Sequence, residues 1–304
     1  MSLTVLDHRD AILKALDSER SAGRRIGLVP TMGSLHAGHT SLMQRAAAEC
    51  DVVVATLFVN PLQFGPGEDL ATYPRDFEQD SRQAEAAGVG YLFAPSRQEM
   101  FPEPPLTEVT VGRLSDVLEG AIRPGHFRGV ATIVTKLLSL AGPCRAYFGE
   151  KDYQQLAVIR RLTSDLSLPA EIVACPTVRA GDGLALSSRN AYLTSEERAI
   201  APTLYQALLA GRAAAAGATA AAACATADHR GATADHQGAT ADQVRATMSA
   251  TVAQQPAFQL DYAEVVDPTN LTPLTTLARD ARLLIAARLG TTRLIDNLAA
   301  PRPR

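Results

Sequence analysis

The sequence predicts an α/β fold, a Rossmann-like doubly wound parallel sheet followed by a second, smaller α+β domain. Short apolar, β-branched runs alternate with longer stretches of helical period over roughly the first 175 residues. This alternation ends after Pro176, where a loop rich in Gly, Ser and Arg begins. A chain of 304 residues is also long for one domain. We therefore expect one domain over residues 1–177 and another over residues 178–304.

Five apolar runs in the first domain have the length and composition of strands. They cover residues 25–30, 51–59, 90–95, 144–149 and 171–176. Because strands that alternate with helices form parallel sheets with right-handed crossovers, these runs predict one parallel sheet. Ligands of such sheets bind beyond the carboxyl ends of the strands, so we expect functional side chains directly after each run.

Between these runs lie segments with apolar residues three and four positions apart, which predict helices. They cover residues 39–50, 75–88, 129–142 and 152–166. In the second domain a helix is expected from about Thr194, because Glu196 and Glu197 favour a helix N-terminus. Apolar runs at residues 259–266 and 282–290 predict two late strands.

An alanine-rich stretch, residues 207–250, interrupts the second domain. A seven-residue unit repeats within it from Ala225, as ATADHRG, ATADHQG and ATADQVR. The first two units offer only alanine at apolar positions and end in glycine, which disfavours a coiled coil. We expect a helical or disordered surface insertion. His229 and His236 recur with the repeat, and we expect them to be solvated rather than to bind a metal.

Composition and charge exclude several classes of function. A net charge of −3 gives no electrostatic drive toward nucleic acid or an anionic membrane. No apolar run approaches the roughly 20 residues that span a bilayer, and the N-terminus lacks the apolar core of a signal peptide. The four cysteines are far apart without a C-x-x-C pair, which argues against a zinc site or a disulfide framework. We expect a cytoplasmic protein without a nucleic-acid or membrane partner.

The most informative segment, PTMGSLHAGH, follows the first predicted strand. It predicts a turn containing Gly33 and Gly38 and a helix from His39 or Thr40. Exposed backbone N–H groups at a helix N-terminus attract anions. Because His36 and His39 stand three positions apart, both can donate to one phosphate chain. The alternative is that one histidine caps the helix while the other packs against the protein. An H-x-G-H pattern directly after a strand disfavours this alternative.

Polar residues also follow two other predicted strands. Asn60 and Gln63 in FVNPLQF can fix an oxygen-rich substrate through directed hydrogen bonds, although a polar turn imposed by Pro61 is an equal alternative. Lys151 in GEKD is a point charge suited to a phosphate. Asp152 is an acceptor for an adenosine hydroxyl or, equally, the cap of the next helix.

The loop LSSRN in the second domain combines hydroxyls with a guanidinium. Ser187 and Ser188 supply the hydroxyls, and Arg189 supplies a fork of donors that matches phosphate oxygens. Closure of such a loop over a bound phosphate would exclude water. A flexible linker that ends in a helix cap is the alternative. Asp80, after YPRD, could approach Mg²⁺ through water, but we expect its helix to be solvated and assign no protein ligand to a metal.

These segments resemble, in order, those of the pantothenate synthetase family within the HIGH-motif nucleotidyltransferase superfamily. They are PTMGSLHAGH, FVNPLQF, YPRD, LEGAIRPGHFRGV, FGEKDYQQL and DGLALSSRN. The resemblance covers nearly the whole chain apart from the insertion and the extreme C-terminus. It implies an ATP-dependent ligase that joins pantoate to β-alanine through a pantoyl-adenylate, with Mg²⁺ on the ATP phosphates, working as a homodimer. A nucleotidyltransferase of the same superfamily and a non-catalytic nucleotide-binding scaffold are the alternatives.

The resemblance also implies roles for single residues. Catalysis falls to His36, His39, Lys151 and Arg189. ATP contacts fall to Met32, Gly33, Ser34, Leu35, His36, Ala37, Gly38, His39, Gly149, Glu150, Lys151, Asp152, Val178, Leu186, Ser187, Ser188 and Arg189. Gln63 and Gln155 contact pantoate, Gln63 also contacts β-alanine, and Asn60 completes the substrate site. Arg123 and His126 lie near the mouth of the site or form a structural turn.

Overall fold

The computed structural model describes residues 2–227, 240–277 and 280–301, without the side chains of 218–227. It divides into two compact units, Met1–Val178 and Arg179–Arg304. Most of the heptad repeat, with His229 and His236, lies outside the described residues. None of the described helices combines the length and apolar character that a membrane crossing requires.

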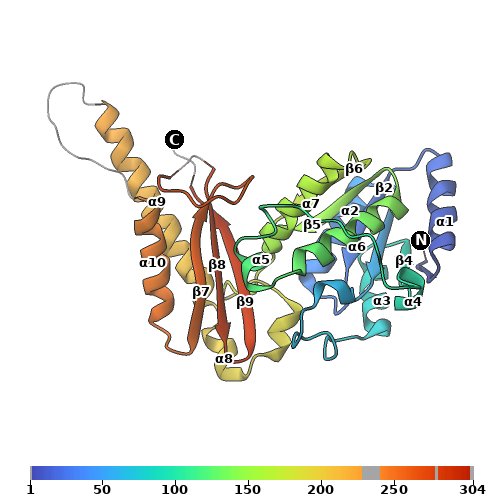
Figure 1. The fold of residues 1–304 in the computed structure, drawn as a ribbon, viewed down its shortest axis with the longest axis horizontal. Coiled ribbons are helices and arrows are strands. Elements are labelled where there is room, and N and C mark those ends of the chain that lie inside the picture. Colours follow the sequence, from blue (N-terminus) through green and yellow to red (C-terminus); the bar gives the residue numbers. More distant parts are fainter. Residues whose placement is uncertain (1, 228–239, 278–279, 302–304) are drawn as a thin grey trace. The chain divides into compact units, whose positions relative to one another are not determined.

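Within the described residues, the first unit holds a six-stranded sheet in which every pair of neighbours is parallel, as predicted. Its strands follow the order β1-β4-β3-β2-β5-β6; Figure 1 labels β2, β4, β5 and β6 among them. They are β1 (Thr4–Leu6), β2 (Ile26–Thr31), β3 (Val52–Leu57), β4 (Tyr91–Phe93), β5 (Cys144–Gly149) and β6 (Ala170–Cys175). β1 was not predicted, because its three residues are largely exposed and carry no apolar run. Backbone pairing with β4 holds it in the sheet.

The order of the strands reverses at β2. From β2 the chain adds β3 and β4 on one side, and later β5 and β6 on the other. Such a switch point leaves a crevice beyond the carboxyl ends of the two central strands. The segments that follow β2 and β5 therefore meet, and β3 ends next to them.

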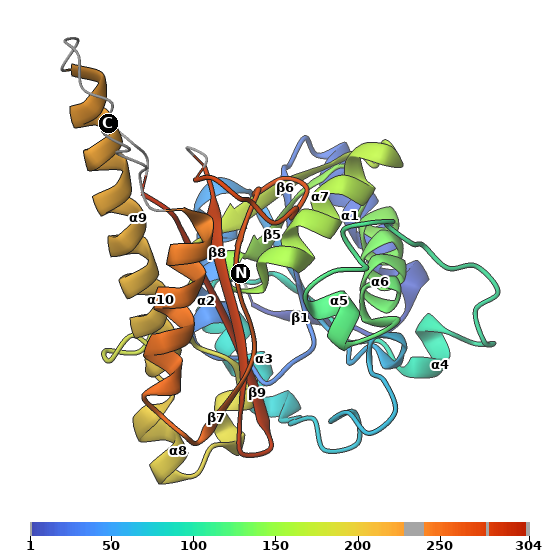
Figure 2. The ribbon, with the colours of Figure 1, turned by 60° about the vertical axis from the view of Figure 1, so that its left-hand side comes forward.

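Helices cover both faces of this sheet (Figure 2). α2 and α3 pack on one face, over a core that includes Met43, Ala84 and Tyr147. α1, α6 and α7 form the other layer. The longer helices are α1 (Arg9–Ser21), α2 (Ala37–Glu49), α3 (Phe77–Ala86), α6 (His126–Ala141) and α7 (Tyr153–Asp165). Short turns of helix are η1 (Pro61–Gln63), α4 (Arg97–Met100), α5 (Glu119–Ile122) and η2 (Glu150–Asp152).

The second unit is the predicted α+β domain. Over its described residues, an antiparallel sheet β7-β8-β9 packs against α9 and α10. Its elements are η3 (Ser188–Tyr192), α8 (Ser195–Ile200), α9 (Thr203–Ala227), α10 (Ala241–Ala253), β7 (Phe258–Val266), β8 (Arg282–Leu289) and β9 (Thr292–Ala299). Thr194 caps α8 through a reciprocal capping box with Glu197. β9 was not predicted, because buried Asp296 and Asn297 interrupt its apolar pattern.

The alanine-rich stretch contributes to the core rather than standing wholly at the surface as expected. Leu208 of α9 and Met248 of α10 are fully buried. A Cβ on Gly211 would come within 2.6 Å of the Met248 side chain, so the two helices pack closely there. Small residues in this stretch thus permit close helix packing.

Candidate active site

The segment after β2 forms a tight turn that presents two imidazoles. Gly33 and Ser34 have positive φ, at 90° and 52°, and His36 then takes an extended conformation. α2 begins at Ala37, two or three residues earlier than the predicted start at His39 or Thr40, because His36 is its N-cap. Gly38 N donates to His36 Nδ1 at 3.1 Å, and His36 N donates to His39 Nδ1 at 3.4 Å. The two histidines therefore form a reciprocal capping box.

These contacts determine which nitrogen of each ring carries the proton. A neutral imidazole has one acceptor and one donor nitrogen. Because both Nδ1 atoms accept backbone hydrogen bonds, both Nε2 atoms are donors. The ring centroids of His36 and His39 lie 4.1 Å apart. A Cβ on Gly38 would come within 2.7 Å of His36 Cε1, so glycine is needed for this ring to fold back onto the helix.

Burial keeps both imidazoles neutral. It lowers the pKa of His36 to about 4 and that of His39 to about 3. The charge of Lys151 contributes to both of these pKa shifts, and the charge of Asp152 opposes them. The pair therefore acts as two fixed neutral donors near pH 7 rather than as cations.

We expect the imidazole ¹⁵N spectra of His36 and His39 to show the neutral Nε2–H tautomer at pH 6. Because the folded pKa values lie below the ordinary 6.5, the unfolded chain binds more protons between pH 6.5 and about 4. The free energy of unfolding should therefore fall as the pH drops through this window, which denaturant titrations would measure. Rings that are protonated at pH 6 would contradict the assignment.

The backbone donors of the turn are already used inside the protein. Ser34 N donates to Asp80 Oδ2 at 2.9 Å and Leu35 N to Asp80 Oδ1 at 2.7 Å. Gly33 N lies 3.3 Å from Thr31 Oγ1. These three amides are therefore satisfied inside the protein, whereas the expectation about anions concerned the N-terminus of α2 and stays a prediction. Side chains are the donors that the turn offers to a phosphate.

Asp80 was considered in the sequence only as a residue that could approach Mg²⁺, and its contact with the turn after β2 was not predicted. The acidic helix α3 was expected to be solvated, but Asp80 is only 4% exposed. The signal was its spacing, since Asp80 lies four residues before the buried Ala84 and so shares the core-facing side of the helix. A carboxylate on that side must find partners, and it finds them in the turn after β2.

The end of β5 brings an ammonium group beside the imidazoles. Lys151 lies in η2, with its side chain 18% exposed and its Nζ 3.4 Å from Asp152 Oδ1. Lys151 follows β5, which pairs with β2, so it lies at the same edge of the sheet as the segment with the imidazoles, and its charge lowers the pKa of both rings. Asp152 stands before α7, but within the described part of the chain its side chain makes no capping hydrogen bond. Asp152 is thus the N-cap residue of α7 by position, without a side-chain capping bond, and its contact with a ligand stays a prediction.

The end of β3 supplies an oriented amide. Asn60 is 1% exposed, and its Nδ2 donates to Gln63 Oε1 and to Gly129 O, both at 3.0 Å. Gln63 Oε1 accepts a hydrogen bond from Asn60, so Gln63 Nε2 points away from Asn60. This Nε2 donates to Met32 Sδ at 3.1 Å. Gln63 thus presents a donor beside the turn after β2. Asn60 holds Gln63 in place and itself occupies a polar turn.

The position of η1 depends on a glycine in α6. A Cβ on Gly129 would overlap the backbone carbonyl of Leu62 and come within 2.6 Å of Gln63 N. We expect Gly129→Ala to displace η1, to lower the free energy of unfolding by about 1–3 kcal/mol, and to weaken binding of pantoate, the substrate that the resemblance implies. Isothermal titration would measure the binding. Gly112→Ala is the matched control, since a Cβ there meets nothing within 4 Å; equal pantoate affinity in both variants would contradict the role of η1.

Arg123 and His126 form the structural turn that was one of their two expected roles. Arg123 pairs with Glu68, with both Nε–Oε1 and Nη2–Oε2 at 2.7 Å. A guanidinium only donates, so His126 Nε2 accepts from Arg123 Nη1 at 3.0 Å and His126 Nδ1 donates to Gln63 O at 2.8 Å. Burial lowers the pKa of His126 to about 4, which keeps it neutral. This cluster holds the backbone of Gln63, the residue that carries the oriented amide.

The remaining predicted residues lie on both sides of the division between the units. Gln155 is half-buried on α7, and Val178 ends the first unit. Leu186, Ser187, Ser188 and Arg189 belong to the second unit. Ser187 Oγ accepts from Arg189 N at 3.3 Å and so caps η3.

The loop that leads to η3 is anchored within the second unit. Arg179 pairs with buried Asp296 through two hydrogen bonds of 2.5 and 2.9 Å, and its guanidinium lies 3.9 Å from the centroid of the Tyr205 ring. Asn190 Nδ2 donates to Ala185 O at 3.0 Å. These contacts connect the segment to β9 and α9, so it is not an unattached linker.

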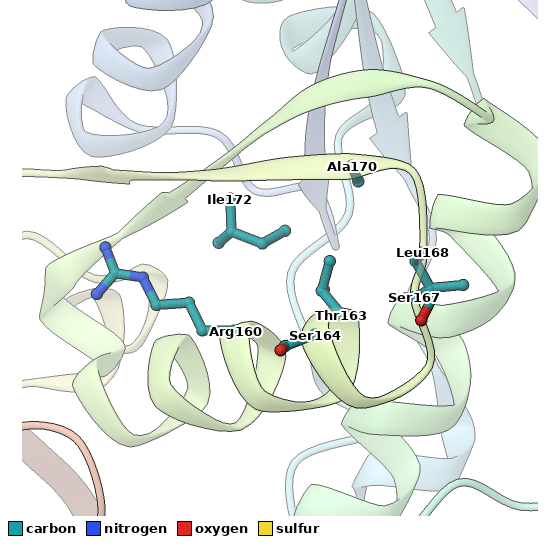
Figure 3. A pocket seen from close by; sticks show the side chains of 7 residues that line it. All are labelled: Arg160, Thr163, Ser164, Ser167, Leu168, Ala170 and Ile172. Carbon is teal, nitrogen blue, oxygen red and sulfur yellow. The ribbon is translucent and has the colours of Figure 1, made fainter.

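A hollow of about 430 Å³ lies elsewhere in the first unit, between α7 and the start of β6 (Figure 3). It is lined by Arg160, Thr163, Ser164, Ser167, Leu168, Ala170 and Ile172. None of these is a predicted site residue, and the hollow lies at the amino end of β6, whereas the imidazoles follow the carboxyl end of β2. In the portion of the chain that the structure describes, no three His, Cys, Asp or Glu side chains are grouped to hold a metal ion.

Known proteins are similar to this chain in sequence and in fold. A family model described as pantoate-beta-alanine ligase matches residues 4–299. The pantothenate synthetase of Herpetosiphon aurantiacus is 47% identical over 292 residues, covering 94% of this chain and 99% of that protein. That of Pseudomonas fluorescens is 50% identical over 301 residues, covering 97% and 96%.

Solved structures of pantothenate synthetases are also similar to this chain. Pantothenate synthetase from Thermus thermophilus superposes with a TM-score of 0.86 at 46% identity, covering 98% of this chain and 99% of that one. The pantoate-beta-alanine ligase from Francisella tularensis, complexed with beta-gamma ATP and beta-alanine, superposes with a TM-score of 0.76 at 32% identity, covering 98% of each chain. The fold, the order of the site segments and these matches agree: the chain belongs to the pantoate–β-alanine ligase family.

Proposed function

We propose that this chain condenses pantoate with β-alanine to form pantothenate, using ATP and releasing AMP and pyrophosphate. The observation that carries the proposal is that two Nε2–H donors, from His36 and His39, and the ammonium of Lys151 stand on the segments that follow the paired strands β2 and β5. Membership of the ligase family supports it, as does the relative whose structure holds an ATP compound and β-alanine.

The proposed reaction has two steps, formation of the adenylate and its aminolysis. A carboxylate oxygen of pantoate attacks the α-phosphorus of ATP, the bond from that phosphorus to the bridging oxygen breaks, and pyrophosphate leaves with the electron pair. The amine of β-alanine then attacks the acyl carbon and loses a proton, while the bond from that carbon to the phosphate oxygen breaks and AMP leaves. Neither step needs a protein nucleophile; both need aligned reactants and stabilised charge.

The described residues are of the types that these steps require. Neutral Nε2–H donors remain protonated near pH 7 and need no rearrangement as charge develops on the phosphate. Lys151 supplies a full positive charge beside them. Gln63 offers an oriented N–H to a pantoate oxygen, and Gln155 is the second pantoate contact that we propose. Mg²⁺ travels on the ATP phosphates and offsets their charge.

Other assignments complete the proposal. Residues 1–177 bind ATP and pantoate, and residues 178–304 act as a lid. Within the lid, Arg189 contacts the phosphates together with Ser187, Ser188 and Leu186, and its fixed fork of donors supports this role. Nucleotide contacts also come from the segments 32–39 and 149–152 and from Val178. We further propose that the enzyme is a cytoplasmic homodimer.

ATP–pyrophosphate exchange tests the function. The enzyme is incubated with ATP, labelled pyrophosphate and one candidate acid, and no amine is added. Exchange that depends on pantoate is expected, because formation of the adenylate is reversible. Exchange without any acid, or a product that keeps the AMP group after β-alanine is added, would instead indicate a nucleotidyltransferase.

A further inference from the structure

The turn that presents the imidazoles has a conformation that its own residues do not favour. Ser34 has φ of 52°, in the left-handed region that residues other than glycine seldom adopt. It follows Gly33, whose φ is 90°. A residue held there persists only when its surroundings fix it. The capping box of His36 and His39 begins two residues later, so the direction of both rings depends on this turn.

Asp80 fixes the turn through both of its carboxylate oxygens. Oδ2 accepts from Ser34 N at 2.9 Å, and Oδ1 accepts from Leu35 N at 2.7 Å. A Cβ on Gly33 would come within 2.9 Å of Oδ2, so the carboxylate lies directly against the turn. Since each oxygen receives a different backbone donor, an amide in its place could satisfy only one of them.

Asp80 is itself held rigidly. Asp76 caps α3 by accepting from Gln79 N at 2.9 Å, and Asp80 N donates to Asp76 O at 2.9 Å. One turn later, Ala84 is fully buried in the core between α2, α3 and the sheet. The carboxylate thus connects a packed helix to the turn that ends β2.

We propose that Asp80 is a positioning residue for adenylation, which holds the turn after β2 so that the Nε2 donors of His36 and His39 meet the phosphates. This inference rests on the proposed function. It differs from a role in binding Mg²⁺, because the carboxylate acts through the backbone of Ser34 and Leu35. Misplacing a reacting group by about 1 Å commonly lowers rates about 100-fold.

The test compares two variants that each remove one negative charge from the first turn of α3. Asp80→Asn keeps the shape of the side chain but loses one backbone hydrogen bond. Glu78→Gln is the matched control, since Glu78 is 86% exposed and lies 3.7 Å from Arg82. We expect Asp80→Asn to lower pantoate-dependent ATP–pyrophosphate exchange about 10–100-fold with little change in the pantoate KM or in the Mg²⁺ requirement. Glu78→Gln should match the parent enzyme.

Two outcomes of this comparison would overturn the inference. One is parental exchange by Asp80→Asn; the other is recovery of the lost rate at high Mg²⁺, which would make Asp80 a metal-related residue. Aminolysis of supplied pantoyl-adenylate should fall much less than exchange, because the imidazoles serve the first step; an equal fall in both would indicate general structural damage and also overturn it.

A measurement on the parent enzyme needs no variant and no activity. The amides of Ser34 and Leu35 should exchange slowly with deuterium, because a buried carboxylate accepts from both. Rapid exchange there would refute the contact even if Asp80→Asn failed to fold. If no acid supports pyrophosphate exchange but these amides are protected, the proposed function fails while the structural role of Asp80 stands.

Discussion

Replacing His39 by alanine is expected to slow pantoate-dependent ATP–pyrophosphate exchange about 10²–10³-fold, the usual loss when one fixed donor to a developing charge is removed. His39 accepts the His36 N–H at Nδ1, so its Nε2 carries the proton that a phosphate oxygen would receive as a hydrogen bond. The variant also removes the acceptor for the His36 backbone and loosens the capping box. Pantoate affinity should change little, because the amides that we assign to pantoate lie on other segments.

His8→Ala serves as the control for this variant. His8 precedes α1 and its side chain is 71% exposed, so the substitution removes an imidazole from the same unit without touching the turn. Exchange rates are measured by incorporation of labelled pyrophosphate into ATP, and pantoate binding by calorimetry. Near-normal turnover in His39→Ala would remove His39 from the mechanism.

The second large effect is expected from Lys151→Met, which keeps much of the side chain's length but removes its charge. Adenylation should slow about 10²-fold or more, since the ammonium is the only full positive charge that we place on the triphosphate from the first unit. The same variant should raise the pKa of His36, because the charge of Lys151 now lowers it. Ring ¹⁵N titration would detect that change independently of activity.

Two further variants define what Lys151 contributes. Lys151→Arg keeps the charge in a different shape and should recover part of the rate. Lys14→Met removes a lysine from an exposed position on α1 and should leave exchange unchanged. A Lys151→Met enzyme with parental exchange and an unchanged His36 titration would show that the ammonium does not act beside the imidazoles.

The location of the site followed from the sequence because its segments come directly after strands with strong apolar signals. β2, β3 and β5 are buried runs, and parallel strands bring their carboxyl ends to one edge. The residues after them could therefore be placed together before the fold was known. His36, His39 and Lys151 stand on the segments that follow β2 and β5, the two strands at the switch point.

The finer features depend on contacts between distant segments, which no local pattern encodes. Asp80 lies 46 residues from Ser34, and only the packing of α3 against the sheet brings its carboxylate to the turn. The tautomers of His36 and His39 follow from hydrogen bonds within the capping box. β9 was missed because its buried Asp296 is satisfied by Arg179, which is 117 residues away in the chain.

The central claim is that a pantoate carboxylate oxygen attacks the α-phosphorus of ATP at this site. Pantoate labelled with ¹⁸O in its carboxylate tests it most directly, with mass spectrometry of the products after complete conversion with β-alanine. One labelled oxygen is expected in AMP and none in pyrophosphate, because that oxygen stays on the α-phosphorus when the acyl bond breaks. Unlabelled AMP, or label in inorganic phosphate, would contradict the account.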